Sequence, residues 1–299
     1  MSAITSLTAQ NTKEVTKIVD LDPEFIAEQI RVCVSDIGVD AIKTGMLHTS
    51  DIIRTVSREL RGLDVPKVVD PVMVAKSGAQ LLQPAAVDEL KKSLLPVSTV
   101  ITPNASEATV LSGIRIRTEE DQREVAKNLA EAYGIPAVVV KGGHLHGERV
   151  IDILYYEGSY YRYEVPRLDT RATHGTGCVF ASAVATELAK GSTIPEAVKT
   201  AQRFVYDAIK GGFLIGQGAG PVNPMSYVAK RAGLLEALTN VREAVRMIED
   251  AEGGEELAPE SGINIAEAPV GATNRDEVVA VPGRIIRVFN RLKAASHPW

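Results

Sequence analysis

Short β-branched runs alternate with longer stretches of helical period from about residue 20 to residue 215. This alternation is typical of βαβ units around a mostly parallel sheet. It predicts strands over 40–47, 67–72, 99–104 and 137–143, and helices over 50–63, 85–95, 118–133, 177–190 and 194–210. Residues 149–157 and 160–165 alternate more strictly, which predicts an antiparallel hairpin at a sheet edge. We therefore expect an α/β protein whose ligands bind beyond the carboxyl ends of the strands.

The pattern changes after Met225. A helical stretch over 227–251 leads into a flexible, acidic segment over 253–264 and then into a short block that ends at Trp299. With 299 residues and a hydrophobic content of 45%, the chain is long enough for one large core and a small second unit.

Charge and cysteine usage exclude several classes of protein. The net charge of −5 comes from scattered acidic and basic residues, and no cluster of basic and aromatic residues indicates nucleic-acid binding. No stretch approaches the roughly 20 apolar residues of a membrane span, and no leader-like segment follows Met1. Cys33 and Cys178 lie in different local contexts and predict no disulfide framework. We therefore expect a cytoplasmic protein that binds neither nucleic acid nor a membrane.

A glycine-rich turn precedes the helix predicted over 177–190. Gly175 and Gly177 allow a tight turn, so that free N–H groups and the positive end of the helix dipole face outward together and favour an anion. Thr176 can add a hydroxyl donor. Cys178 lies in the first helical turn, where the dipole favours the thiolate, and a thiolate there can accept a proton from a substrate hydroxyl. The alternative is a purely structural turn with Cys178 as a small core residue, and the local pattern leaves both interpretations open.

Several segments carry a family resemblance. HGTGC (174–178) resembles the GTG(C/D) element of ribokinase-like kinases, whose fourth position holds the catalytic base, and its cysteine is similar to the hydroxymethylpyrimidine kinase branch. Further segments resemble that family in its own order: LTAQNT, SDIGVDAIKTGML, VVDPVMVAKSG, ITPNASEA, VVVKGGH and GPVNP. The resemblance covers roughly the first 225 residues. It implies a ribokinase-like three-layer α/β/α sandwich that phosphorylates 4-amino-5-hydroxymethyl-2-methylpyrimidine, or its phosphate, with ATP and Mg²⁺ in thiamine biosynthesis.

Asn104 and Glu107 follow a predicted strand at a spacing of three, which brings both side chains to one face of the next helical turn. Such a pair can hold the water shell of Mg²⁺, which borrows only one or two protein oxygens, and the resemblance supports this role. The alternative is an N-cap formed by Asn104 or Ser106 beside a solvated Glu107, which is the better interpretation of these residues taken alone.

Other strand-end residues predict a phosphate site. Asp70 ends an otherwise apolar strand and can add charge near the metal. Lys141 follows four apolar residues and precedes two glycines, so its ammonium can offset phosphate charge, although a snorkelling lysine would look the same. His174 adjoins the glycine-rich turn. His144, His146 and His174 have no metal-ligand spacing. We predict that Lys141, His174, Asn104 and Asp70 bind ATP.

The acceptor site rests on the resemblance. Gln10 resembles the family's residue that pairs with the edge of the aminopyrimidine, since an amide offers both a donor and an acceptor. Met46 and Val72 resemble positions that pack on the ring, although Met46 taken alone would be ordinary core.

Both ends differ from the family pattern. Family members begin with a strand and a GSD-type segment upstream of LTAQNT, so we expect the first strand to be missing and a sheet edge to be left unpaired. The segment over 240–288 resembles the beginning of a thiamine-phosphate synthase domain, of which about the first third is expected here, so we assign no synthase activity. The expected domains are therefore a kinase domain over 1–238 and a partial second domain over 239–299.

Two other functions remain open. The same scaffold and base position serve pyridoxal-type kinases. The missing first strand also allows a catalytically silent module that binds a nucleotide or a pyrimidine. Exposed sheet edges favour a homodimer.

Overall fold

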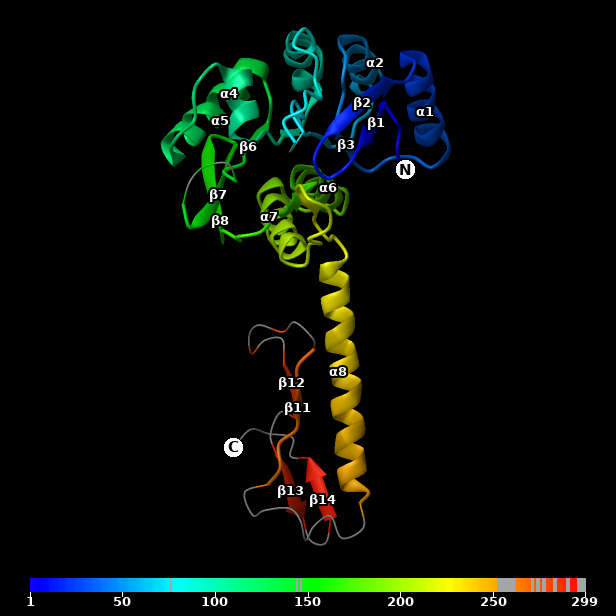
Figure 1. Ribbon diagram of the computed structural model, residues 1–299, viewed down its shortest axis with the longest axis vertical. Helices are drawn as coiled ribbons and strands as arrows, with labels where there is room; N and C mark the ends of the chain where they lie inside the picture. The colour runs from blue at the N-terminus through cyan, green and yellow to red at the C-terminus, as the bar shows by residue number, and fades with distance from the viewer. Residues whose placement is uncertain are drawn as a thin grey trace. The chain divides into compact units, whose positions relative to one another are not determined.

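The computed structural model describes residues 1–75, 77–143, 145, 147–251, 262–269, 272, 275, 278–281, 284–288 and 291–294 (Figure 1). The chain divides into two compact units, Met1–Pro224 and Met225–Trp299. The division lies before helix α8 (Ser226–Glu249), whereas the boundary expected after residue 238 falls within that helix.

A six-stranded sheet forms the centre of the first unit. Its order is β3 (Ile42–Thr44), β4 (Lys67–Val69), β5 (Val100–Ile101), β6 (Ala137–Val140), β7 (Arg149–Tyr156) and β8 (Ser159–Pro166). Strands β3 to β6 are parallel, and β7 and β8 are antiparallel. The predicted parallel sheet and edge hairpin are confirmed. The parallel strands are shorter than predicted, and β4, β5 and β6 end directly before Asp70, Thr102 and Lys141.

Helices cover both faces of this sheet. Side chains alternate along the buried strands, so Val69 and Ile101 join one apolar cluster while Val68 and Val100 join the other. The first cluster includes residues of α1 (Pro23–Asp36), α2 (Ser50–Arg61), α3 (Ala86–Glu89), α4 (Ala105–Ser112) and α5 (Glu119–Tyr133). The second includes residues of α6 (Thr176–Ala189) and α7 (Ile194–Lys210), which pack against each other (Figure 1). The expected three-layer sandwich is confirmed.

Helix starts follow local capping rules. The Thr118 side chain accepts from Asp121 N, while the Asp121 carboxylate accepts from Thr118 N, so a capping box starts α5. The helix expected over 85–95 is irregular: α3 passes into a π-helical turn over Leu90–Leu94 and a 3₁₀ turn over Leu95–Val97.

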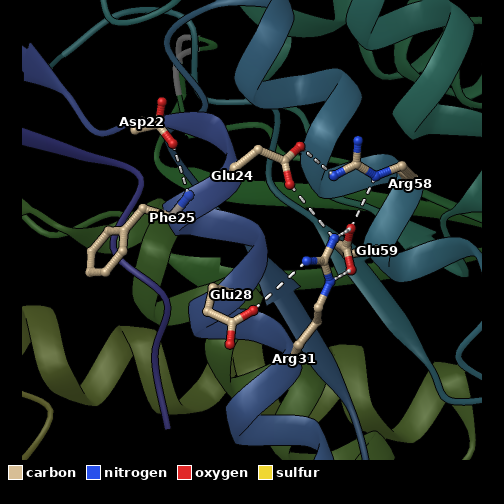
Figure 2. A network of polar contacts seen from close by, with 7 residues as sticks. All are labelled: Asp22, Glu24, Phe25, Glu28, Arg31, Arg58 and Glu59. Carbon is tan, nitrogen blue, oxygen red and sulfur yellow. Dashed lines mark hydrogen bonds and ion pairs between the residues drawn. The ribbon is translucent and has the colours of Figure 1, made fainter.

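Charged side chains link α1 to α2 on the outer surface (Figure 2). Arg31 donates to both oxygens of Glu59 at 2.9 and 2.8 Å, and Arg58 reaches Glu24 at 2.9 Å and Glu59 at 3.0 Å. Phe25 lies apart from this network (Figure 2) and is exposed. Because the guanidinium groups of Arg31 and Arg58 are exposed to solvent, water screens these ion pairs and they contribute little to stability.

An antiparallel hairpin precedes α1 and was not predicted. It consists of β1 (Ser6–Gln10) and β2 (Val15–Asp20), and both strands are mostly exposed. Thr12 at its tip accepts hydrogen bonds from Ala219 N at 3.0 Å and, through Oγ1, from Gly218 N at 3.2 Å. Gly218 and Ala219 lead directly into β10 (Gly220–Pro221), which pairs in parallel with β9 (Ala172–His174).

The second unit contains α8 and two short antiparallel pairs. Strand β11 (Ala266–Glu267) pairs with β12 (Val279–Ala280), and β13 (Ile285–Val288) pairs with β14 (Arg291–Ala294). Within this unit, Asn240 Nδ2 donates to Glu267 Oε1 at 3.0 Å. The long helix predicted over 227–251 is confirmed. The predicted acidic segment lies outside the described residues except for 262–264. Among the helices of the described residues, none has both the length and the apolarity to cross a membrane.

The contact at the hairpin tip can be tested with Gly218→Ala. An added Cβ would lie 1.8 Å from the Thr12 carbonyl oxygen, so the free energy of unfolding should fall by about 1–3 kcal/mol. Gly62→Ala is the matched control, because an added Cβ there meets no atom within 4 Å. Urea unfolding followed by circular dichroism measures both variants, and equal stability would show that segment 216–219 does not hold the tip.

Candidate active site

Polar side chains gather at the carboxyl ends of β4, β5 and β6. Lys141 Nζ lies 3.0 Å from Asp70 Oδ1, and Thr102 Oγ1 donates to the same oxygen at 3.3 Å. Asp70 is 2% exposed. Lys141 also forms an isolated parallel bridge with Asn104. Sheet order explains this convergence, since neighbouring parallel strands end at the same edge.

The start of α6 faces this ion pair. Gly175 is the N-cap residue and adopts a left-handed φ of 86°, a conformation that favours glycine. A Cβ added at Gly177 would lie 3.2 Å from Lys141 Nζ and 3.5 Å from Asp70 Oδ2. Lys141 Nζ also lies 5.9 Å from the centre of the Phe180 ring, one turn further along the helix. The glycine-rich turn and the strand-end ion pair therefore form one cluster.

The other residues of the turn differ in exposure. Cys178 and His174 are exposed, so the interpretation of Cys178 as a small core residue is wrong. The Thr176 hydroxyl donates to the carbonyl oxygen of Thr173 at 3.2 Å. This bond would have to break before Thr176 could donate to a phosphate.

Asn104 and Glu107 form a capping box at the start of α4. Asn104 Oδ1 accepts from Ser106 N and Glu107 N at 2.9 and 3.0 Å, and Glu107 Oε2 accepts from Asn104 N at 2.8 Å. The N-cap alternative is therefore observed, but Glu107 is not solvated, because it is only 7% exposed. The pKa of Glu107 is raised from 4.5 to about 7, mainly by burial; the Lys141 charge opposes this shift and the Asp70 charge adds to it.

Lys141 remains a cation in this cluster. Burial alone would lower its pKa, but the charges of Asp70 and Glu107 outweigh burial, and the pKa is raised above its ordinary value. The ammonium is therefore a fixed positive charge beside the start of α6.

The donor set is compatible with Mg²⁺. Asn104 and Glu107 offer only oxygen ligands, and within the described part of the chain no three His, Cys, Asp or Glu side chains form a metal cluster. Mg²⁺ usually keeps several waters and takes one or two protein carboxylates together with substrate phosphates. The residues thus fit a water-mediated site and not a closed protein cage.

The residues predicted for the acceptor do not form one cluster: Val72 lines a cavity, Met46 follows β3, and Gln10 ends the exposed strand β1. A cavity next to Asp70 is lined by Val72, together with Gly45, Leu47, Pro71, Leu82, Leu90 and Leu94. Met46 follows β3, and its carbonyl oxygen accepts from Thr5 Oγ1 at 2.9 Å. Gln10 is exposed at the end of β1. His144 and His146 lie outside the described residues.

Sequence reasoning missed Thr102, Phe180 and Asp152. Thr102, directly after β5, and Phe180 of α6 contact the ion pair, and nothing local in the sequence distinguishes them from core residues. Asp152 is an acid within the apolar strand RVIDILYY, and that position was a signal which could have been noticed.

Comparisons with known proteins agree with this architecture. The phosphomethylpyrimidine kinase family model matches residues 1–223, and that of thiamine-phosphate synthase ThiN matches residues 240–299. A hydroxymethylpyrimidine/phosphomethylpyrimidine kinase of Streptomyces coelicolor is 46% identical over 223 residues, which cover 75% of this chain and 82% of that protein.

Two solved structures have the same fold. The ADP complex of Bacillus subtilis pyridoxal kinase is 37% identical with a TM-score of 0.70, covering 76% of this chain and 87% of that one. Phosphomethylpyrimidine kinase from Clostridium difficile is 38% identical with a TM-score of 0.62, covering 70% and 86%. The expected ribokinase-like fold is confirmed.

The raised pKa of Glu107 predicts a pH-dependent stability. Between about pH 4.5 and pH 7 the folded protein holds a proton that the unfolded chain releases, so the contribution of Glu107 to stability falls as pH rises through this interval. Glu107→Gln keeps an oxygen for the Asn104 N–H but does not ionise. Relative to the unmodified chain, this variant should gain up to about 3 kcal/mol between pH 4.5 and pH 8.

Urea unfolding across this pH range measures the difference. Glu124→Gln, on the exposed surface of α5, controls for removal of a negative charge. A stability difference between Glu107→Gln and the unmodified chain that stays constant with pH would contradict the prediction.

Proposed function

The chain belongs to the phosphomethylpyrimidine kinase family, and from this membership we propose that it transfers the γ-phosphoryl group of ATP to the hydroxymethyl group of 4-amino-5-hydroxymethyl-2-methylpyrimidine or its monophosphate. The observation that carries the proposal is the contact between the Gly175–Gly177 turn and the Lys141–Asp70 pair. It joins an anion-binding helix start to a fixed cation.

The turn and the lysine stabilise the migrating phosphoryl group. In the transition state its negative charge spreads over three oxygens, so fixed donors and positioning provide most of the catalysis. The backbone N–H groups at the start of α6 and the Lys141 ammonium supply such donors. Asp70 holds the ammonium in place through a direct ion pair at 3.0 Å. His174 and Asn104 border the same phosphate site.

Cys178 is the catalytic base in this mechanism. As the substrate hydroxyl oxygen bonds to the γ-phosphorus, its proton passes to the Cys178 thiolate and the bond to ADP breaks. The thiol then returns the proton to solvent. Support comes from the exposure of Cys178 in the first turn of α6, beside the glycine-rich turn.

Asn104 and Glu107 hold Mg²⁺ through water in this proposal. The ion supplies charge neutralisation on the nucleotide phosphates. The capping box keeps both side chains at the end of β5, and binding of a cation would favour the ionised form of Glu107.

The acceptor occupies the side of the site formed by Met46 and Val72, with Gln10 on the pyrimidine edge. Support comes from Val72, which lies beside Asp70 and lines a small cavity with it. We further propose that the chain works as a cytoplasmic homodimer. Its two cysteines are free, which suits a reducing compartment, and light scattering would measure the oligomeric state.

Pyridoxal phosphorylation is the second candidate, because the fold is similar to that of Bacillus subtilis pyridoxal kinase. Parallel assays with ATP, Mg²⁺ and either the hydroxymethylpyrimidine or pyridoxal separate the two candidates. We expect higher kcat/KM for the pyrimidine. Nucleotide binding without turnover of either acceptor would instead identify a catalytically silent module.

Cys178→Ala tests the base. Removing a general base should lower kcat by about 100-fold or more, with little change in stability, because the side chain is exposed. Cys33→Ala in α1 is the matched control and should retain activity. Chromatographic detection of the phosphorylated pyrimidine measures both variants, and full turnover by Cys178→Ala would remove this cysteine from the mechanism.

Gly177→Ala tests the contact between the turn and the ion pair. Its Cβ would lie 3.2 Å from Lys141 Nζ, and the flexible end of the lysine can move away. We therefore expect a stable protein whose displaced ammonium reduces kcat by about tenfold or more. Steady-state assays beside the Gly62→Ala control check this, and unchanged kcat in Gly177→Ala would show that the ammonium position is unimportant.

A further inference from the structure

Three polar side chains converge at the carboxyl end of β6, and each comes from a different layer of the sandwich. Gln122 belongs to α5, Asp152 to β7 and Gln202 to α7. They are 0%, 5% and 7% exposed. Buried polar groups of this kind are usually hydrogen-bonded, and of the buried polar atoms of these three side chains, Gln122 Oε1 alone has no partner among the described residues.

Asp152 accepts one hydrogen bond on each carboxylate oxygen. Gly142 N donates to Oδ1 at 2.9 Å, and Gln202 Nε2 donates to Oδ2 at 2.8 Å. On the other face, Gln122 Nε2 donates to the carbonyl oxygens of Val140 and Ile151 at 3.0 and 3.1 Å. The main chain around Lys141 is therefore held by side chains from both sides of the sheet.

The sheet itself does not hold Gly142. The antiparallel ladder between β6 and β7 ends at the pair Val140 and Ile153, and Lys141 pairs instead with Asn104 on the opposite side. A Cβ at Gly142 would lie 2.0 Å from the Ile151 carbonyl oxygen, so only glycine fits this close approach. The Gly142 N–H has left the ladder, and Asp152 supplies its acceptor.

A carboxylate is more than this hydrogen bond requires. A neutral amide could accept from Gly142 N at a lower desolvation cost. Burial raises the pKa of Asp152, while Gly142, Gln202 and Lys141 favour its ionised form. Asp152 in turn contributes to the raised pKa of Lys141, after Asp70 and Glu107. The negative charge therefore acts on the same lysine whose main chain the carboxylate anchors.

We propose that Asp152, held by Gln202, is a positioning residue that fixes the Lys141–Gly142 main chain, so that the Lys141 ammonium stays between Asp70 and Gly177. The inference rests on the proposed kinase function, in which Lys141 faces the nucleotide phosphates. Asp152 therefore governs the use of ATP and not recognition of the acceptor.

The test compares Asp152→Asn with the double variant Asp152→Asn and Gln202→Glu. In the single variant the new amide oxygen can still accept from Gly142 N, and the Gln202 amide can turn over to accept from the new NH2 group, so the hydrogen bonds become neutral and the charge is lost. In the double variant the new amide can donate to the new carboxylate, which makes that hydrogen bond charge-assisted again and returns a negative charge nearby. We expect Asp152→Asn to lower kcat/KM for ATP by about tenfold or more, since hydrogen bonds to a buried charge are strong, while KM for the pyrimidine stays within about twofold.

The double variant should recover most of the lost kcat/KM for ATP. Ile53→Val, a buried truncation in α2, controls for lower stability alone and should leave both kinetic constants unchanged. Wild-type kinetics in Asp152→Asn, equal losses for ATP and the pyrimidine, or no recovery in the double variant would each overturn the inference.

Failure of the kinase proposal gives a different result. If the unmodified chain phosphorylates neither acceptor, calorimetric affinity for a non-hydrolysable ATP analogue decides the role of Asp152. Weakening by about fivefold or more in Asp152→Asn, with recovery in the double variant, would support it, and unchanged affinity would refute it.

Discussion

The buried ion pair between Lys141 and Asp70 is the contact on which the proposed site depends. A buried pair is not stabilising by its mere presence, because desolvation offsets much of the attraction unless further hydrogen bonds satisfy both partners. Here Thr102 donates to Asp70. The pair lies at the carboxyl ends of β4 and β6, with β5 between them. The pair also explains the glycine at 177, since a side chain there would meet both charged groups. One electrostatic contact thus constrains two strand ends and the start of a helix.

The charges around Lys141 do not balance. Asp70, Glu107 and Asp152 surround one ammonium, and the cluster is negative whenever at least two of these carboxyls are ionised. A nucleotide phosphate adds further negative charge, so it cannot bind there on the strength of Lys141 alone. The dipole and free N–H groups of α6 offset part of this charge. A divalent cation near Asn104 and Glu107 would offset more, which gives a physical reason for Mg²⁺ that does not depend on family membership.

The sequence predicted those features that depend on local order. Periodicity indicated the strands and helices, and the polar residues Asp70, Asn104 and Lys141 stood out because each ends an apolar run. Pairing across the sheet was not readable in this way. Lys141 and Asp70 are 71 residues apart, and their contact follows from strand order. The hairpin of β1 and β2 escaped prediction because its strands are mostly exposed and lack a buried alternation. Asn104 and Glu107 show a further limit, since the same spacing predicts both a capping box and a metal site.

Gly142, Gly175 and Gly177 make the main chain, more than side chains, the lining of the site around Lys141. Gly142 lies against the Ile151 carbonyl and Gly177 against Lys141, while Gly175 adopts a left-handed conformation. At Gly142 and Gly177 the absence of a side chain lets the main chain come close to a neighbouring group. The N–H groups in both segments lie outside the sheet ladder and the helix ladder, so other groups must accept from them. At Gly142 the carboxylate of Asp152 satisfies the N–H from within the core, whereas at the start of α6 the first N–H groups have no partner within their own helix. The glycines at the two places thus have different consequences. The Gly142 N–H, bound to Asp152, fixes the main chain beside Lys141. The first N–H groups of α6 have no partner within the helix and can donate to an anion.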